Sequence, residues 1–295
     1  MIALLVACQT PEVQVEPPVD PPSDAPWVLP ATTSTGADLA AVAASAQDAI
    51  ARVVEIDPDP VLDAYRALYA GADAGCPALY RDDDVEYWLD TCTSGAGTVF
   101  DGFGLDETLT IDDGAGVYDV TATGGAGRIE AADGTFVEVD GYVQRIDQSD
   151  GTVVVSSLVL SGDFSTNVPG TDGTWLGEGI RPNLAVTRYS IGGQLILFGV
   201  EGALDQLPGE NPAVAFHDAV ILDPDLGYGG CGDEPSGTMS VRLPSGEWVD
   251  IDFDPVVNDD GLVEIDDPAA CDGCGAGWHR AESLGPICLD FAAWR

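Results

Sequence analysis

Two patterns of apolar and polar residues divide this 295-residue chain near residue 76. Before that point, apolar residues recur every three or four positions in two segments. After it, apolar and polar residues alternate in short runs that are separated by Gly and Asp. The first spacing is typical of one face of a helix, and the second is typical of a half-buried strand. The chain therefore predicts a short helical region followed by a long β region.

The helical region contains two predicted helices, at residues 37–54 and 61–69. Asp59 is a favourable N-cap and Pro60 suits the first helical position, so the second helix begins there. Its predicted end lies near Gly71. The apolar stripe of the first helix is formed by Leu39, Val42, Ala46, Ile50 and Val53. We expect residues 31–75 to form a helical hairpin that packs on the sheet.

The β region is typical of antiparallel strands joined by tight turns. Val137, Val139 and Val143 lie on one face of an alternating run, and Asp150-Gly151 turns the chain back. Other alternating or apolar runs lie at residues 108–111, 117–120, 152–155, 194–200, 214–222, 239–243 and 249–253. Because no helical pattern separates these runs, a parallel α/β sheet is disfavoured. The predicted fold class is mainly β, an antiparallel sheet or meander in residues 76–295, built as a sandwich or an open barrel, with an N-terminal helical hairpin.

The charge of the chain excludes two classes of partner. It has 51 acidic residues against 10 basic ones, all of them Arg, and a formal net charge of -41. Such a chain repels nucleic-acid phosphates and anionic lipid head groups, because both are bound by Lys and Arg. Hydrophobic residues nevertheless make up 45% of the chain, so it can bury a core of its own.

The chain begins with a short apolar run that ends in Leu5-Val6-Ala7-Cys8. This tetrapeptide resembles the lipobox of a bacterial lipoprotein signal peptide. The resemblance implies that residues 1–7 are removed, that Cys8 carries lipid, and that the protein is held at a membrane through that lipid. It also implies the outer membrane or cell surface, because Gln9 rather than Asp follows the cysteine. Residues 8–30 are rich in Pro and acidic residues and predict an extended tether.

Six further cysteines fit an exported, disulfide-bonded domain. They are Cys76, Cys92, Cys231, Cys271, Cys274 and Cys288. An even number predicts three disulfides, for which fifteen pairings exist. The spacing favours Cys76–Cys92, and Cys274–Cys288 would close a second short loop. Cys271-Asp272-Gly273-Cys274 with nearby His279 leaves zinc binding or dithiol chemistry as alternatives.

A calcium site is a further prediction at the end of the chain's β region. Asp250, Asp252 and Asp254 alternate with Val249, Ile251 and Phe253, so three carboxylates point to one side of a predicted strand. Carboxylate oxygens are the ligands that Ca²⁺ prefers. A solvated polar face is the alternative explanation of the same pattern.

Specific catalytic motifs are absent from the sequence. No His-Glu-x-x-His, Gly-x-Ser-x-Gly or P-loop occurs, and the two histidines, His217 and His279, lie far apart in the chain. We therefore expect a lipid-anchored cell-envelope protein with a binding or structural role, whose partner is an envelope protein or a glycan. An exported hydrolase acting on glycans and a calcium-dependent adhesion module are the alternatives.

Overall fold

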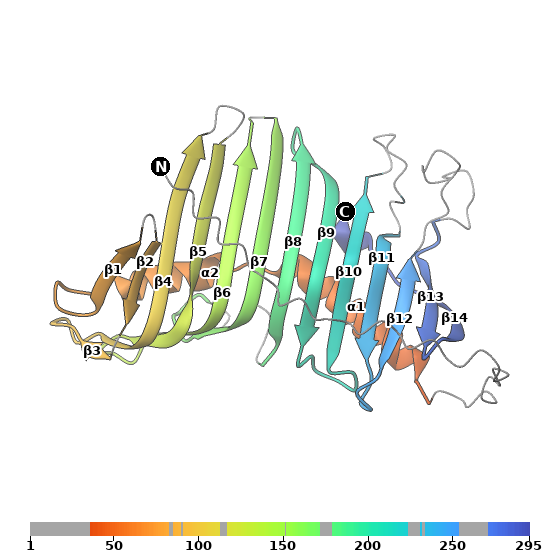
Figure 1. The fold of residues 1–295 in the computed structure, drawn as a ribbon, viewed down its shortest axis with the longest axis horizontal. Coiled ribbons are helices and arrows are strands. Elements are labelled where there is room, and N and C mark those ends of the chain that lie inside the picture. The colour runs from red at the N-terminus through yellow and green to blue at the C-terminus, as the bar shows by residue number, and fades with distance from the viewer. Residues whose placement is uncertain are drawn as a thin grey trace, which may run out of the picture. The chain divides into compact units, whose positions relative to one another are not determined.

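A computed structural model describes residues 36–82, 85–89, 91–112, 117–150, 152–171, 179–223, 231, 234–253 and 271–295 (Figure 1). Residues from Ala37 onward form one compact unit. The predicted signal peptide and tether, with Cys8, and the predicted ligand Asp254 lie outside the described residues.

The described strands form one 14-stranded antiparallel sheet, which is open and confirms the predicted fold class (Figure 1). Neighbouring strands follow the order of the chain, except that β3 pairs with β4 beside β2. The strands are β1 (Ala78–Asp82), β2 (Val85–Leu89), β3 (Cys92–Thr93), β4 (Val99–Asp112), β5 (Val117–Glu130), β6 (Phe136–Ser149), β7 (Val153–Thr166), β8 (Arg181–Ile191), β9 (Gln194–Asp205), β10 (Ala213–Leu222), β11 (Ser236–Arg242), β12 (Trp248–Phe253), β13 (Cys274–His279) and β14 (Glu282–Cys288).

Two helices precede the sheet, α1 (Leu39–Glu55) and α2 (Asp59–Tyr69). Asp38 caps α1, because its carboxylate accepts the backbone N–H groups of Ala40 and Ala41 at 3.0 and 3.2 Å. The second helix begins slightly earlier than predicted, with Pro58 as its N-cap and Asp59 as its first residue. Both predicted helices are therefore present, with boundaries that differ by one or two residues.

The helices cover one face of the sheet and bury their apolar stripes there (Figure 1). Helix α1 contacts β10, β11 and β14, and α2 contacts β5, β6 and β7. Val42, Ile50 and Val53 of α1 and the facing Val241 and Phe216 are all fully buried. Burial of one such side chain stabilises the fold by about 1.5–3 kcal/mol, so this interface is the core of the protein. We call the opposite side of the sheet the outer face.

The C-terminus also packs on the helix-covered face. A short 3-10 helix, η2 (Ala292–Trp294), places the indole of Trp294 against Phe198, with ring centroids 5.0 Å apart. The Trp294 Nε1–H donates a hydrogen bond of 3.1 Å to the carbonyl of Ile50 in α1. The last residues of the chain thereby link the sheet to the first helix.

A row of glycines crosses four strands at one level of the helix-covered face. Gly104, Gly125, Gly141 and Gly162 are successive partners in register on β4 to β7. A Cβ at Gly141 would lie 2.9 Å from the Cα of Gly162, and Gly162 has a φ of +89°. A side chain at Gly125, Gly141 or Gly162 would clash with the backbone of the neighbouring strand. A row of glycines of this kind is typical of a bend in a sheet.

Candidate functional site

The outer face carries no helix among the described residues (Figure 1). Residues paired across strands lie on the same face, and alternate residues lie on opposite faces. The register of each pair of strands therefore assigns the paired residues to a face. Outward-facing residues include Leu89, Val159, Ile191, Trp248 and Trp278, which are 37–42% exposed.

Apolar side chains cluster on β4 to β9, the central strands of the outer face. They lie in the halves of these strands that are drawn at the top of Figure 1. Leu109, Val120 and Ile146 are partners in register, and all three lie on this face. All three are of intermediate burial, and no helix or second sheet among the described elements packs on them. The apolar zone, as we call it, comprises Leu109, Tyr118, Val120, Ile146, Val155, Tyr189 and Leu197. These side chains keep part of their apolar surface accessible, and a contiguous apolar patch on a protein surface is typical of a contact site.

Aromatic residues extend this surface toward β1. The rings of Tyr80 and Tyr87 stack with centroids 5.5 Å apart and an interplanar angle of 17°. On β6, Tyr142 lies against Gly124, where a Cβ would be 3.0 Å from the Tyr142 ring. Burial, and then the charge of Glu107, raises the pKa of Tyr142. Tyr142 therefore covers the space beside Gly124 on the outer face, and Tyr80 and Tyr87 cover each other.

Asp250 and Asp252 of the predicted calcium site lie on the outer face of β12, as their alternation indicated. The Ser240 hydroxyl donates to Asp250 at 2.6 Å, and the Thr238 hydroxyl donates to Asp252 at 2.8 Å. Within the described residues, no group of three acidic, His or Cys side chains is arranged to hold a metal ion. Since Asp254 lies outside the described residues, calcium binding stays a prediction.

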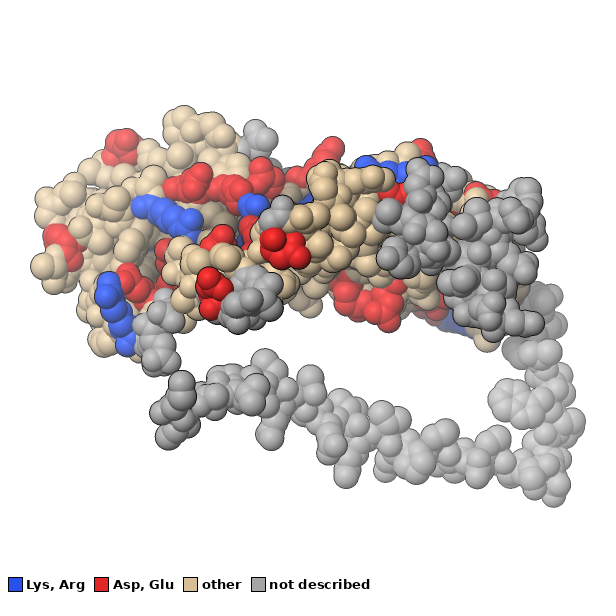
Figure 2. All heavy atoms as spheres, turned by 90° about the horizontal axis from the view of Figure 1, so that it is seen from above, with Lys and Arg blue, Asp and Glu red and all other residues tan. Residues whose placement is uncertain are grey.

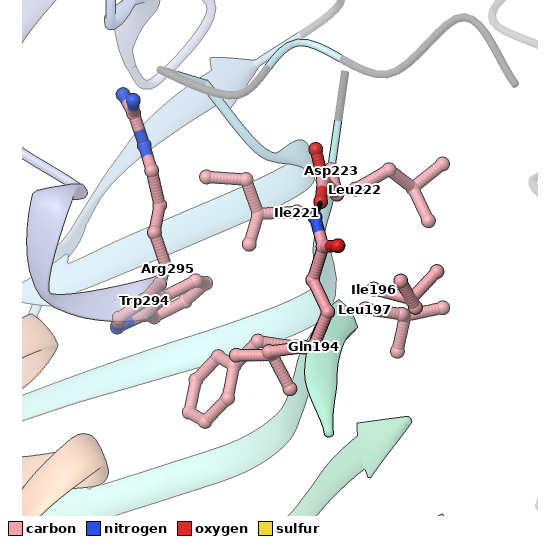
Figure 3. Close-up of a pocket in the computed structure, with 10 residues that line it drawn as sticks. Gln194, Ile196, Leu197, Ile221, Leu222, Asp223, Trp294 and Arg295 are labelled. Atoms are coloured by element: carbon pink, nitrogen blue, oxygen red, sulfur yellow. Dashed lines mark hydrogen bonds between the residues drawn. The ribbon is translucent and has the colours of Figure 1, made fainter. Parts of the chain in front are cut away.

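A small cavity of about 310 Å³ lies at the ends of β9 and β10, next to the C-terminus (Figure 3). Trp294 and Ile221 lie on one side of these strands, whereas Leu222 points to the other side (Figure 3). Gln194 donates a hydrogen bond of 2.5 Å to Asp223 at the rim. Ligand pockets usually measure about 300–1,000 Å³, so this cavity suits only a small apolar group.

A polar cavity of about 250 Å³ separates α2 from β5 and β6. Arg145 on β6 donates to both carboxylate oxygens of Asp59, at 2.7 and 3.0 Å, and to Asp147 at 2.7 Å. Burial lowers the pKa of Arg145, but the hydrogen bonds and charges of Asp59 and Asp147 outweigh it and raise the pKa. The carboxylates of this cavity therefore serve to hold α2 on the sheet, and their arrangement gives no specific support to a hydrolase.

The six cysteines predicted to form disulfides are all bridged. The structure contains the two pairings that the spacing favours, Cys76–Cys92 and Cys274–Cys288, and it joins Cys231 to Cys271. Cys271 and Cys274 therefore belong to different bridges, so the alternatives of a zinc site and a dithiol pair are wrong. Three disulfides indicate an extracellular or otherwise oxidising environment.

A buried carboxylate lies beside the Cys231–Cys271 bridge. Glu234 is 5% exposed, and its Oε2 accepts the backbone N–H groups of Asp272 and Gly273, both at 3.2 Å. Burial raises the pKa of Glu234. This glutamate ties the start of β11 to the start of β13, a contact that the sequence did not indicate.

The two histidines do not meet. His217 lies on the outer face of β10, where its Nδ1 is 3.9 Å from Glu201. His279 is buried on the other face, and its Nε2 is 3.2 Å from Glu247. No catalytic pair of histidines is therefore formed.

No protein-family model, no curated protein and no solved structure matches this chain. Among the described residues, no helix is both long enough and apolar enough to cross a bilayer. On the surface seen from above the strands, acidic residues outnumber basic ones, as the net charge requires (Figure 2). The candidate site defined by this chain's own geometry is the outer face of its sheet.

Sequence reasoning missed most of that face. The apolar zone belongs to strands of 11 to 14 residues, whereas the sequence predicted separate runs of about four to eight. One signal was present in Val153-Val154-Val155, where apolar residues point to both faces of a strand. Trp248 was a second signal, because it shares the polar face of the alternating run that contains Val249, Ile251 and Phe253.

Proposed function

We propose that this protein is an exported, lipid-anchored binding protein of the cell envelope that holds a partner protein against the outer face of its sheet. The apolar zone carries this proposal, because its side chains leave part of their apolar surface in water and a partner that packs on them would bury it. The three disulfides and the resemblance of residues 5–8 to a lipobox support the cellular location.

Site-specific photo-crosslinking tests the docking face. Val155 lies on the outer face within the apolar zone, whereas its neighbour Val154 points to the helix-covered side and is 42% exposed. A photoreactive residue at position 155 is expected to give one discrete adduct in envelope fractions, and the same residue at position 154 is not. Equal labelling from both positions, or none from 155, would refute the proposed docking face.

Mass spectrometry of the mature protein tests the anchor separately. We expect a mature chain that begins at Cys8 with acyl groups on that residue, and a Cys8→Ser variant that leaves the membrane fraction. Recovery of an unprocessed and unmodified N-terminus from the membrane fraction would contradict lipid anchoring without affecting the docking face.

A further inference from the structure

The end of the outer face over β11 to β13 differs in chemistry from the apolar zone. We call it the tryptophan–aspartate zone. It consists of Thr238, Ser240 and Arg242 on β11, Trp248, Asp250 and Asp252 on β12, and Trp278 on β13. Aliphatic side chains give way here to two indoles, two carboxylates, two hydroxyls and one guanidinium.

The two tryptophans of this zone are exposed, unlike those of the core. Trp248 and Trp278 are 39% and 38% exposed, whereas Trp88 and Trp294 are 2% and 1% exposed. Indoles carry a large apolar surface and an N–H donor, which is why surface tryptophans concentrate at binding sites. Two of them on one face of adjacent strands form a rigid aromatic surface.

The register places a carboxylate between the indoles. Asp250 is the partner of Trp278 across β12 and β13, and it lies two residues from Trp248 on the same face of β12. Direct partners have Cβ atoms about 4.5–5.5 Å apart, and next-nearest residues on one face lie about 7 Å apart. A ligand of one or two rings that rests on either indole therefore reaches the Asp250 carboxylate.

Hydroxyl groups fix the orientation of both carboxylates. Ser240 donates to one oxygen of Asp250 at 2.6 Å, and Thr238 donates to one oxygen of Asp252 at 2.8 Å. Within the part of the chain that the structure describes, the second oxygen of each carboxylate accepts no further hydrogen bond. Each aspartate therefore presents a pre-oriented acceptor to a ligand that brings hydroxyl donors.

From this arrangement we infer that the tryptophan–aspartate zone binds an uncharged saccharide. The C–H face of a sugar ring carries partial positive charge and packs on the negative face of an indole. Its hydroxyls donate to Asp250 and Asp252, and Arg242, the partner of Trp248 in register, supplies donors to the ring and hydroxyl oxygens. Anionic saccharides are disfavoured by the two carboxylates and by the net charge of -41. This inference rests on the proposed function only in that both assign binding to the outer face.

Titration of the full chain with defined glycans tests the inference. The probes are cellohexaose, maltohexaose and N-acetylchitohexaose as uncharged saccharides, an oligogalacturonate as an anionic one, and spermidine as an organic cation. We expect at least one uncharged hexasaccharide to change the indole fluorescence and to release heat on binding, with no response to the oligogalacturonate. Binding of spermidine alone, or of none of the uncharged hexasaccharides up to their solubility limits, would overturn the inference.

Variants assign the binding to these residues. Trp248→Ala and Trp278→Ala are each expected to weaken binding by about tenfold or more, the effect of removing a central aromatic contact. Asp250→Asn keeps the shape of the side chain and is expected to weaken binding less. Leu89→Ala is the matched control, because Leu89 is 42% exposed on the outer face at the opposite end of the sheet. Equal affinity of the two tryptophan variants and the parent protein would place the saccharide elsewhere and refute the assignment.

The crosslinking at position 155 separates this inference from the proposed function. Trp278→Ala is expected to leave the position-155 adduct intact, since the two zones lie on different strands. Saccharide binding without any adduct at position 155 would refute the proposed protein partner and support the saccharide site. An adduct at position 155 without saccharide binding would refute the saccharide site and support the protein partner.

Discussion

The indole Nε1–H of Trp88 on β2 donates a hydrogen bond of 3.0 Å to the hydroxyl of Tyr65 on α2, inside the core. Both residues are 2% exposed, and Trp88 also packs edge-on against Phe100 with centroids 5.6 Å apart. This contact fixes the second helix on the edge of the sheet at which β1 and β2 lie. It therefore lends itself to a direct test of the helix–sheet interface.

We expect Tyr65→Phe to lower the free energy of unfolding by about 1–3 kcal/mol, because the Trp88 N–H loses its acceptor while it stays buried. Urea unfolding of the full chain measures the loss. Tyr69→Phe is the control, since Tyr69 is only partly buried and its ring stacks beside Tyr65 without such a hydrogen bond among the described residues. A loss as large for Tyr69→Phe would show that the hydrogen bond is not the cause.

The Tyr65 phenol also predicts a dependence on alkaline pH. Burial raises its pKa well above the ordinary value, against the weaker opposing effect of the hydrogen bond from Trp88. The unfolded chain therefore loses this proton near pH 10 while the folded chain keeps it, so the stabilisation present below that pH is lost as the pH rises. Between pH 9 and 11, as measured by urea unfolding, Tyr65→Phe is expected to lose less stability than the parent protein. Parallel pH curves for the two proteins would contradict this.

Gly104 predicts a large steric effect at the bend of the sheet. A Cβ there would lie 2.6 Å from the Tyr65 hydroxyl oxygen and 2.6 Å from Trp88 Cε2. We expect Gly104→Ala to destabilise the protein by about 1–3 kcal/mol or more, as overpacking does in a filled core. Gly199→Ala is the matched control in β9, because its Cβ would meet only ordinary contacts of 3.5 and 3.6 Å. Thermal unfolding is expected to show no loss for the control, and a similar loss for both variants would refute the steric explanation.

Glu234 predicts a stability difference that grows with pH. Burial raises its pKa, so its contribution to stability is fully present below the unfolded value near 4.5 and is lost as the pH rises through the folded value. In Glu234→Gln, the amide oxygen can still accept the N–H groups of Asp272 and Gly273, and no charge is buried. We therefore expect the variant to gain stability relative to the parent protein between pH 4 and pH 8, measured by urea unfolding at each pH. A gain that is constant over this range would show that the carboxylate does not titrate as described.

The Cys274–Cys288 bridge closes a short loop around the β13–β14 hairpin, with a sequence separation of 14. Replacement of both cysteines by Ser is expected to lower the free energy of unfolding by about 3 kcal/mol, the entropy that a loop of this length returns to the unfolded chain. Urea unfolding of the parent protein and of the double variant, both without reductant, measures the loss, and a double variant as stable as the parent protein would contradict the estimate.

The local patterns of the sequence predicted the two helices and parts of β4 to β7 and of β9 to β12, because helical and strand periodicities differ within ten residues. The alternation of Val249, Ile251 and Phe253 correctly placed these residues in the core and Asp250 and Asp252 on the outside. Loop length also favoured the Cys76–Cys92 and Cys274–Cys288 bridges. By contrast, the Cys231–Cys271 bridge has a sequence separation of 40, and spacing gives no preference at that distance.

The sequence by itself determined the fold class, the presence of the two helices, and the two sets of side chains on the strands that alternate clearly, such as β6 and β12. Only the tertiary structure decided which set α1 and α2 cover and which set stays on the outer face. The physical reason is that alternation assigns residues to two faces of a strand. Where both faces carry apolar residues, as at Val154 and Val155, alternation does not indicate which face the helices cover. The covered face depends on the packing of α2 against β5 to β7 and of α1 against β10 and β11, contacts between distant parts of the chain that no local pattern encodes.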